Sequence, residues 1–264
     1  MRYRIPLTVF AALLLVSCGE KPAPDSQDDA RQNLLDILNA EDRLYRDQSL
    51  TSTWMKRKMA YSVWLPNGYD SSKEYPFLYL LHGYGDDSNS WLDKGKARSI
   101  AKEYVTKGGT PMVIVMPDGL TSFYSGNWES YFHQELIPAV EKAFRCSGKR
   151  AIAGLSMGGY GTLYHALNHP GLFLYAYAMS PAVMGDMKSL VDAQADKRIF
   201  PGFTVEVGNQ DMVVDNAGAK DLADYMEGQG LHVEYIARDG THDWNFWQEC
   251  LPKALKKVGE SFSK

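Results

Sequence analysis

The sequence predicts an α/β fold, with a mostly parallel central sheet and helices on both faces. Short apolar runs alternate along the chain with longer stretches whose apolar residues recur at helical spacing, and this alternation is typical of parallel sheets. One run, residues 77–81, is apolar throughout, as expected of a strand that is buried on both faces. Another, residues 151–153, leads directly into a glycine-rich turn and a further helical stretch.

The individual elements follow from this pattern in chain order. The predicted strands cover residues 57–65, 77–82, 112–116 and 150–153, and then residues near 173–179, 203–207 and 232–237. The predicted helices lie near residues 94–107, 130–145, 159–169, 216–228 and 244–258. The sequence contains no internal repeats and shows no sign of a second domain. Its length suits one domain with a full hydrophobic core.

The first residues resemble the signal peptide of a bacterial lipoprotein. Arg2 and Arg4 give a short positive region, and the apolar segment 7–16 is too short to span a bilayer as a helix. Residues 15–18, Leu-Val-Ser-Cys, resemble a lipobox, and cleavage before Cys18 leaves a cysteine that can carry several acyl chains, which anchor stably. The alternative is an ordinary secretory signal. We expect residues 1–17 to be removed and the mature chain to be an extracytoplasmic, membrane-anchored lipoprotein, on the periplasmic or cell-surface side of the outer membrane.

Residues 18–42 are expected to comprise the lipidated cysteine and a flexible tether, because residues 19–30 are polar, acidic and contain two prolines. The apolar residues between 31 and 42 are compatible with a short helix. Residues 43–264 then form the single folded domain. The formal net charge of -4, without any basic run, gives no reason to expect a nucleic-acid partner.

Ser156 lies in the motif Gly-Leu-Ser-Met-Gly at residues 154–158, between a predicted strand and a predicted helix. The Gly-x-Ser-x-Gly nucleophile elbow requires this context of strand, sharp turn and helix. Its two glycines remove side chains that would collide at the turn, and the N-terminus of the helix offers backbone N–H groups to an oxyanion. The motif predicts that Ser156 is a catalytic serine.

A nucleophilic serine needs a base, which follows the serine and the acid in the chain order of α/β-hydrolases. Only His232 and His242 lie well beyond the elbow helix. His232 is inside the predicted strand 232–237, which indicates a structural role. His242 lies in the turn-rich segment 239–244, after that strand, where the loops of such sheets carry catalytic side chains. His242 is therefore the predicted base.

The acid that orients this histidine is expected after the preceding strand. Residues 208–211 form the exit turn of the predicted strand 203–207, so Asp211 is the first candidate. Asp215 is the alternative, although its position better suits an acidic residue at the N-terminus of the next helix. Asp243 adjoins the histidine and could not easily reach its Nδ1 atom.

The second half of the oxyanion hole is expected after the apolar run 77–81, which ends in His-Gly-Tyr-Gly at residues 82–85. Glycines around Tyr84 let a backbone N–H face the nucleophile. The N–H groups of Tyr84 and Met157 are therefore predicted to bind the oxyanion, and each such donor is typically worth about 3 kcal/mol of transition-state stabilisation. His82 is expected to brace this loop and not to transfer protons.

These motifs together resemble a family of esterases that includes esterase D (S-formylglutathione hydrolase), bacterial feruloyl and acetylxylan esterases, and the antigen 85 mycolyltransferases. The resemblance covers roughly residues 50–260 in collinear order. It implies an α/β-hydrolase fold for the catalytic domain, a triad of Ser156, Asp211 and His242, and an oxyanion hole formed by Tyr84 and Met157. The strings that carry it are Tyr-Leu-Leu-His-Gly at 79–83, Val-Met-Pro-Asp-Gly at 115–119, Glu-Leu-Ile-Pro at 135–138, Gly-Leu-Ser-Met-Gly-Gly at 154–159 and Gly-Thr-His-Asp-Trp at 240–244.

Aromatic residues cluster on the loops predicted at the catalytic end of the sheet, and planar side chains stack well on aromatic acyl groups and sugar rings. Tyr124 and Trp128 are the preferred substrate-binding candidates because segment 122–128 has the composition of a loop. Trp244 is a third candidate.

Neither a metal site nor a cofactor is predicted. His165 and His169 are four residues apart on a predicted helix, but no third ligand is evident, so both are expected on or near the surface. Cys146 and Cys250 form either a disulfide or two free buried thiols, because spacing alone does not show whether their Cα atoms approach.

The chain is therefore predicted to be a serine carboxylic-ester hydrolase that acts through an acyl-enzyme. The tether and the aromatic residues favour the removal of feruloyl or related acyl groups from plant cell-wall xylan, so that the partner is an acylated carbohydrate or a small ester. The alternatives are an acetylxylan or short-chain acyl esterase, an acyltransferase of the mycolyltransferase type, and an enzyme like S-formylglutathione hydrolase, with which the signal sequence conflicts. The alternative outside enzymes is an inactive hydrolase fold that binds carbohydrate.

Overall fold

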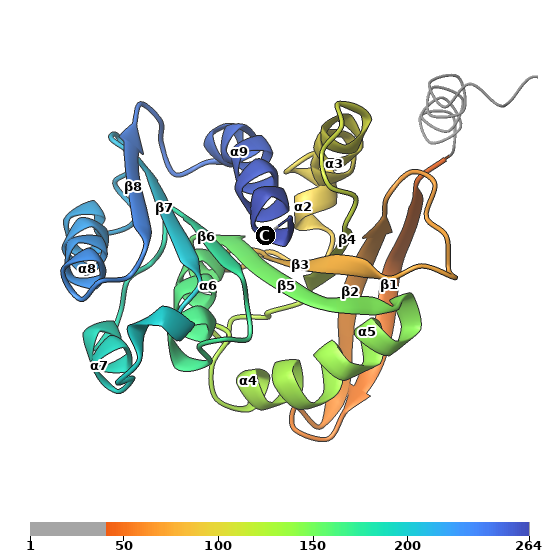
Figure 1. Ribbon diagram of the computed structural model, residues 1–264, viewed down its shortest axis with the longest axis horizontal. Coiled ribbons are helices and arrows are strands. Elements are labelled where there is room, and N and C mark those ends of the chain that lie inside the picture. Colours follow the sequence, from red (N-terminus) through yellow and green to blue (C-terminus); the bar gives the residue numbers. More distant parts are fainter. Residues whose placement is uncertain (1–40, 264) are drawn as a thin grey trace, which may run out of the picture.

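The computed structural model describes residues 41–263 (Figure 1). An eight-stranded sheet lies at its centre, in the order β1-β2-β4-β3-β5-β6-β7-β8. β1 pairs with β2 and β2 with β4 in antiparallel fashion, and the other neighbouring pairs are parallel. The strands are β1 (Arg43–Ser52), β2 (Arg57–Leu65), β3 (Tyr75–Leu81), β4 (Val113–Pro117), β5 (Cys146–Leu155), β6 (Tyr175–Met179), β7 (Gly202–Gly208) and β8 (Val233–Arg238).

Helices cover both faces of this sheet, as the sequence predicts (Figure 1). One hydrophobic core lies between the sheet and α4, α5, α6 and α8, and the other lies between the sheet and α3 and α9. The helices are α2 (Ser90–Asp93), α3 (Ala97–Thr106), α4 (Asn127–Tyr131), the π-helix η1 (Phe132–Leu136), α5 (Ile137–Phe144), α6 (Met157–Asn168), α7 (Met187–Asp192), the 3-10 helix η2 (Lys197–Ile199), α8 (Asn216–Gly228) and α9 (Trp244–Phe262).

The position of β3 between two hydrophobic cores explains why its sequence is apolar throughout. Phe77 and Tyr79 belong to the core beneath α4–α6, whereas Leu78 and Leu80 belong to the core beneath α3 and α9. Alternate side chains of a strand point to opposite faces, and here both faces are covered by helices. The C-terminal end of β3 is therefore held rigidly, and the loop that carries Tyr84 starts from it.

Most of the predicted elements are confirmed, and four short or exposed elements, β1, α2, α7 and η2, are missed. The strand predicted at 57–65 has those limits, and the helix predicted near 130–145 is the continuous run α4–η1–α5 with a π-helical middle. β1 is not predicted because it is an edge strand with mostly exposed residues, so its sequence lacks the alternation of a half-buried strand. α7 is too short for a helical period to be visible.

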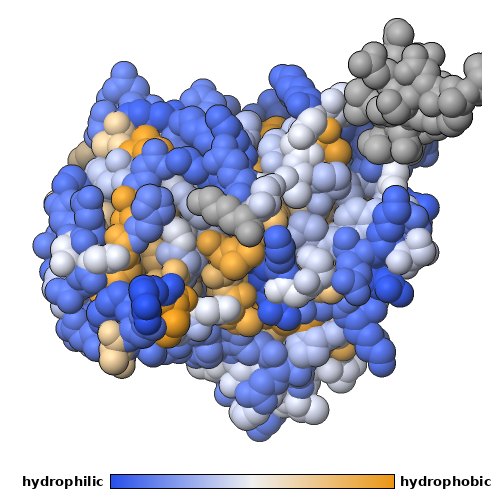
Figure 2. All heavy atoms as spheres, in the orientation of Figure 1, coloured by the Kyte–Doolittle hydropathy of each residue, from blue (hydrophilic) through white to orange (hydrophobic). Residues whose placement is uncertain are grey.

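The predicted signal peptide, Cys18 and nearly all of the tether lie outside the described residues. Within residues 41–263, none of the helices is long and apolar enough to cross a membrane. The face drawn in Figure 2 is mainly hydrophilic, with hydrophobic residues gathered near its centre. Of the two alternatives for Cys146 and Cys250, the structure has the free thiols.

Candidate active site

Ser156 occupies a strained turn between β5 and α6. Its backbone has φ 54° and ψ -114°, in the region that non-glycine residues rarely adopt. The turn is fixed on both sides, since the N–H of Ser156 donates to the Met179 carbonyl (2.9 Å) and its carbonyl accepts from Tyr160 (2.9 Å) and Ala182 (3.1 Å). Strain that the surrounding structure imposes in this way is typical of a nucleophile elbow.

The two glycines of the elbow are required by close approach of the backbone. A Cβ atom on Gly154 would lie 2.4 Å from the carbonyl oxygen of Gly158, and one on Gly158 would lie 2.4 Å from the carbonyl oxygen of Leu81. Atoms cannot approach this closely, so any side chain at either position would push β5, α6 and β3 apart. The spacing of the motif therefore reflects packing at the point where α6 leaves the sheet.

The structure brings Ser156, His242 and Asp211 together in one hydrogen-bonded series. His242 Nε2 lies 3.0 Å from Ser156 Oγ, and His242 Nδ1 lies 2.6 Å from Asp211 Oδ2. Asp211 is buried and the other two residues are partly buried. The remaining oxygen of Asp211, Oδ1, accepts from the N–H groups of Val213 (2.9 Å) and Val214 (3.3 Å), so each carboxylate oxygen has its own partners.

The loops after β7 and β8 meet closely, which places Asp211 beside His242. A Cβ atom on Gly208 would lie 2.3 Å from the carbonyl oxygen of Gly240, so glycine at position 208 permits the contact. Gln210 joins the same loops, because its N–H donates to the Gly240 carbonyl (3.0 Å) and its side-chain oxygen accepts from the Gly240 N–H (2.7 Å). The ring of Trp247 packs edge-on against His242, with ring centroids 4.9 Å apart.

The other candidates for base and acid have structural roles. Asp215 caps the N-terminus of α8 and accepts from the Gly218 N–H (3.0 Å), as its position predicts. Asp243 caps α9 in the same way. His232 is exposed at the start of β8, and its carbonyl accepts from the Phe203 N–H.

The loop after β3 lies against the elbow. A Cβ atom on Gly83 would lie 3.6 Å from Ser156 Cβ, so the backbone of this loop, directly before Tyr84, lies beside the nucleophile. Met157 is the first residue of α6, where an N–H has no acceptor within its own helix. Among the hydrogen bonds recorded for the described residues, neither of these N–H groups has a protein acceptor.

His82 braces this loop, as the sequence predicts. It is buried, its Nε2 accepts from the Gly119 N–H (2.8 Å), and its Nδ1 lies 2.7 Å from the Gly83 carbonyl oxygen. Because both ring nitrogens are engaged with the backbone, His82 is fixed in place and unavailable for proton transfer.

The structure contradicts the prediction that Tyr124 and Trp128 contact substrate. Both side chains are buried, with exposed fractions of 0% and 1%. The Tyr124 hydroxyl donates to the His82 carbonyl (2.8 Å) and the Trp128 indole N–H to the Asp118 carbonyl (3.0 Å). The loop turns inward here because Leu120, Phe123 and Tyr124 all have positive φ, and Gly119 and Gly161 leave room for the Tyr124 ring.

Other aromatic side chains take the place of these two at the surface beside Ser156. Tyr84, on the loop after β3, is 63% exposed, and its ring lies 6.0 Å from that of the half-buried Phe123. The ring of Phe123 packs edge-on against Tyr160, one turn beyond the nucleophile on α6 (5.8 Å). We call Tyr84, Phe123 and Tyr160 the aromatic rim. Sequence reasoning overlooks it, although Tyr84 and Tyr160 adjoin the two motifs that position the oxyanion hole and the serine.

Exposed apolar side chains also follow the orienting acid. Met212 and Val213, which directly follow Asp211, are 92% and 71% exposed. The third predicted aromatic, Trp244, is partly buried and packs edge-on against Trp91 and Trp247 with ring centroids 5.2 and 5.3 Å away. Trp247 in turn contacts His242, so Trp244 lies one ring away from the triad.

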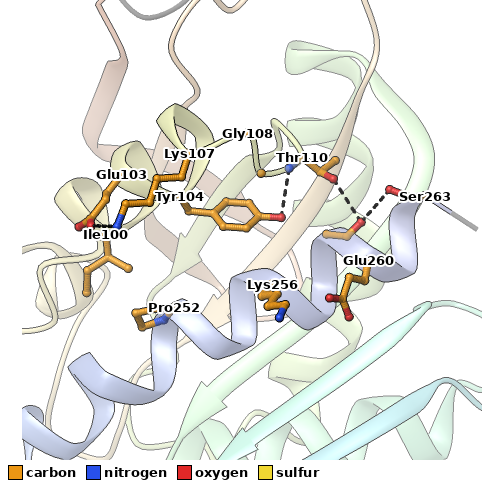
Figure 3. A pocket seen from close by; sticks show the side chains of 12 residues that line it. Ile100, Glu103, Tyr104, Lys107, Gly108, Thr110, Pro252, Lys256, Glu260 and Ser263 are labelled. Carbon is orange, nitrogen blue, oxygen red and sulfur yellow. Dashed lines mark hydrogen bonds and ion pairs between the residues drawn. The ribbon is translucent and has the colours of Figure 1, made fainter.

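A hollow of about 480 Å³ lies elsewhere, between α3 and α9 (Figure 3). The Tyr104 ring extends across it, and Thr110 hydroxyl donates to the Gly259 carbonyl (3.2 Å) at one end. Thr110 precedes β4, whereas Ser156 follows β5. Because these strands run in the same direction, the hollow lies at the N-terminal ends of the strands and the triad lies at their C-terminal ends. It holds none of the predicted site residues.

The prediction for His165 and His169 is wrong in two respects. First, His165 is fully buried and does not lie at the surface. Second, further potential ligands are present, because His133 from η1 and Glu129 from α4 lie beside the two histidines. The potential ligand atoms of these four residues all lie within 4.8 Å of one another. The sequence shows the spacing of four in each pair, Glu129 to His133 and His165 to His169, but only the packing of α4–η1 against α6 brings the pairs together.

Curated proteins with similar sequences are esterases or contain an esterase activity in their names. An acetyl esterase of Caldicellulosiruptor saccharolyticus is 27% identical over 230 residues, 70% of this chain and 84% of the relative. An endo-1,4-beta-xylanase/feruloyl esterase of Xylanibacter ruminicola is 31% identical over 216 residues, 75% of this chain. The chain spans only 29% of the length of that second protein.

Solved structures show the same architecture. A ferulic acid esterase superimposes with a TM-score of 0.75 at 27% identity, over 85% of this chain and 100% of its own. An S-formylglutathione hydrolase from Staphylococcus aureus has a TM-score of 0.66 at 21% identity, over 83% and 97% of the two chains, and shows the fold. The predicted α/β-hydrolase fold is confirmed.

The model of the Esterase family, described as "Putative esterase", matches residues 52–258. This span begins at the end of β1 and runs into α9, so it includes the whole parallel part of the sheet and every residue of the site. The resemblance predicted from the sequence motifs is thereby confirmed, and the chain belongs to this family of esterases.

Proposed function

We propose that the protein is a serine carboxylic-ester hydrolase that acts through an acyl-enzyme on Ser156. The observation that carries the proposal is the series Ser156–His242–Asp211, with contacts of 3.0 and 2.6 Å, next to two backbone N–H groups that have no acceptor within residues 41–263. His242 Nε2 takes the proton of Ser156 as Oγ attacks the ester carbonyl, and then gives it to the departing alcohol. In the second step His242 takes a proton from water as the water attacks the acyl-enzyme, and then returns it to Ser156 Oγ as the carboxylic acid leaves.

The oxyanion of each tetrahedral intermediate would be bound by the N–H groups of Tyr84 and Met157. Gly83 holds the first close to Ser156, and the start of α6 presents the second. The positive end of the α6 dipole acts at the same point. Since the donors are backbone groups on a strand end and a helix end, they are in place before charge develops, which is what makes such donors effective.

For the acyl group, we propose a feruloyl or related hydroxycinnamoyl ester of xylan. The names of the Xylanibacter relative and of the superimposed ferulic acid esterase support this choice. The aromatic rim supports it independently, because an exposed tyrosine and a half-buried phenylalanine beside the nucleophile suit a planar acyl group. The acetyl esterase relative supports the second candidate, removal of short acetyl groups.

A panel of substrates tests both candidates: methyl ferulate, acetylated xylan, p-nitrophenyl acetate and S-formylglutathione. A higher kcat/KM for methyl ferulate than for the acetyl esters supports feruloyl specificity. Turnover of acetylated xylan without turnover of methyl ferulate overturns the acyl-group proposal and leaves the serine mechanism intact. Product analysis with an added sugar acceptor distinguishes hydrolysis from acyl transfer.

Replacing Tyr84 with alanine is expected to lower kcat/KM for methyl ferulate by about 5- to 30-fold, equivalent to about 1–2 kcal/mol of lost stacking. The backbone N–H proposed for the oxyanion hole remains in this variant. p-Nitrophenyl acetate is too small to need the ring, so its kcat/KM is expected to stay within about twofold of the wild type. The measurement is steady-state kinetics on the two substrates.

Trp54→Ala is the matched control, because Trp54 is an exposed aromatic residue (41%) in the turn between β1 and β2. It is expected to leave both substrates unaffected. Equal losses on both substrates in Tyr84→Ala would mean that this ring supports the loop and does not contact the acyl group.

We also propose that the mature protein is anchored to a membrane through acyl chains on Cys18, as the lipobox-like residues 15–18 suggest. Cys18→Ala is expected to move the protein from the membrane fraction to the soluble fraction without loss of esterase activity, because the tether is separate from the triad in sequence. Fractionation of cells and mass spectrometry of the mature N-terminus measure this. An unmodified Cys18 in the wild type, or a mature chain that starts elsewhere, would refute the anchor.

A further inference from the structure

Four potential metal ligands meet where the segment α4–η1 packs against the end of α6. Glu129 and His133 lie one helical turn apart in α4 and η1, and His165 and His169 lie one turn apart at the C-terminal end of α6. We call these four residues the histidine cluster. His133 sits in a π-helical turn, an irregularity that is found frequently at functional sites.

The ligand atoms of the cluster face one another in pairs. His133 Nε2 lies 2.9 Å from His165 Nδ1, and His169 Nε2 lies 2.6 Å from Glu129 Oε1. The rings of His133 and His169 complete the enclosure, with centroids 3.9 Å apart. Ligand atoms about 2.0–2.1 Å from a tetrahedral ion are separated by about 3.3 Å. The ligand atoms of the cluster lie between 2.6 Å and 4.8 Å from one another, so this spacing falls within their range, and binding would move the close pairs apart and the distant atoms together.

His165 is fully buried in the cluster, and its Nδ1 faces His133. An imidazole binds a metal through a ring nitrogen that carries no proton, and His133 and His165 present one ring nitrogen each to the same point.

The carboxylate of Glu129 is held in place by hydrogen bonds from side chains of α6. The Tyr164 hydroxyl donates to Oε2 (2.7 Å) and the Asn168 amide to Oε1 (2.8 Å). Such outer contacts orient the ligand and are usual around metal-binding carboxylates.

We propose that Glu129, His133, His165 and His169 bind one Zn²⁺ ion at a structural site. Three imidazole nitrogens and one carboxylate oxygen, with no open position, are a donor set that suits four-coordinate zinc. Calcium and magnesium prefer sites built from oxygen atoms. The rings of Trp128 and Phe132 pack against His165 (5.8 and 5.0 Å between centroids) and close the site on its buried side.

The ion would tie two segments that both lead to the active site. α6 begins at the nucleophile elbow, and His165 follows Ser156 by nine residues, roughly 13 Å along the helix axis. α4 follows the loop that carries Phe123 of the aromatic rim. The zinc therefore stabilises the frame around the site and takes no part in the acyl transfer, so this inference stands independently of the proposed function.

The test uses the full chain, purified without a histidine tag, before and after treatment with a strong zinc chelator. Elemental analysis is expected to find close to one zinc per chain in the untreated protein or after addition of ZnCl₂. Saturating zinc is expected to raise the midpoint of thermal unfolding of the chelated protein by about 5–10 °C. Co²⁺ added instead is expected to give the strong visible absorption of a tetrahedral site, and MgCl₂ is expected to have no effect.

His169→Gln is the test variant because His169 is only partly buried and its loss leaves the packed His165 in place. It is expected to lose the zinc-dependent shift of the unfolding midpoint. His232→Gln, which removes an exposed histidine outside the cluster, is the matched control and is expected to retain it. A wild type that binds no zinc at micromolar concentrations, or a midpoint that responds equally in His169→Gln, would overturn the proposal.

Discussion

Ser156→Ala is expected to lower kcat/KM for p-nitrophenyl acetate by at least about four orders of magnitude and to abolish covalent labelling by a fluorophosphonate. Removal of Oγ takes away the atom that forms the acyl-enzyme, and the residual rate then comes from the oxyanion hole and substrate binding alone. The backbone at this position is strained for alanine and serine alike, since both have a Cβ atom. The loss is therefore expected to come from the chemistry and not from unfolding.

The two measurements are steady-state kinetics and mass spectrometry of the labelled peptide, with circular dichroism to compare the folds. Ser99→Ala is the matched control, because Ser99 is an exposed serine on α3, and it is expected to label and turn over like the wild type. An alanine variant at position 156 that still labels at full stoichiometry would show that another residue is the nucleophile. The proposed function would then fail with it.

The sequence predicts this part of the site well because the information is local. The elbow at residues 154–158 combines a strand, a sharp turn and a helix with glycines that the close approach of backbones requires. Asp211 and His242 follow neighbouring parallel strands, β7 and β8, so the topology alone brings their loops to one edge of the sheet. β7 and β8 are neighbours both in the chain and in the sheet. The positions of Asp211 and His242 in the sequence therefore predict that their side chains lie close together.

The sequence predicts the surroundings of the site poorly because burial depends on contacts that are distant in the chain. The segment around Tyr124 has the polar composition of a surface loop, but three positive φ angles accompany a turn that buries Tyr124 and leaves Phe123 half-buried. The space for the Tyr124 ring comes from Gly119 and from Gly161, on a different element. Composition indicates that this segment is a loop, but not which of its side chains face solvent.

The histidine cluster fails to show in the sequence for a related reason. Each pair has a spacing of four residues, which is common on helices and predicts no ligand set by itself. The two pairs meet only because the run α4–η1–α5 crosses the C-terminal part of α6. A long-range packing contact of this kind leaves no periodic signal in either segment.

Asp211→Asn is expected to lower kcat by about four orders of magnitude, because the amide favours the wrong tautomer of His242. Oδ1 of Asp211 already accepts from the N–H groups of Val213 and Val214, so the amide oxygen of an asparagine would stay on that side. Its NH₂ group would then face His242 Nδ1, which lies 2.6 Å from Oδ2 in the wild type. An amide donor there requires a bare Nδ1 and moves the proton to Nε2, the atom that must accept the proton of Ser156.

The matched control is Asp215→Asn, since Asp215 caps α8 and asparagine is an equally good N-cap. This variant is expected to keep wild-type kcat and an unfolding midpoint within about 1–2 °C of the wild type. Both variants are compared by the turnover of p-nitrophenyl acetate, which does not need the aromatic rim. Near wild-type activity in Asp211→Asn together with a large loss in Asp215→Asn would transfer the role of orienting acid to Asp215. That result would require the loop after β7 to rearrange, because the Asp215 carboxylate accepts a hydrogen bond from the Gly218 N–H at the start of α8 and Asp211 occupies the position beside His242.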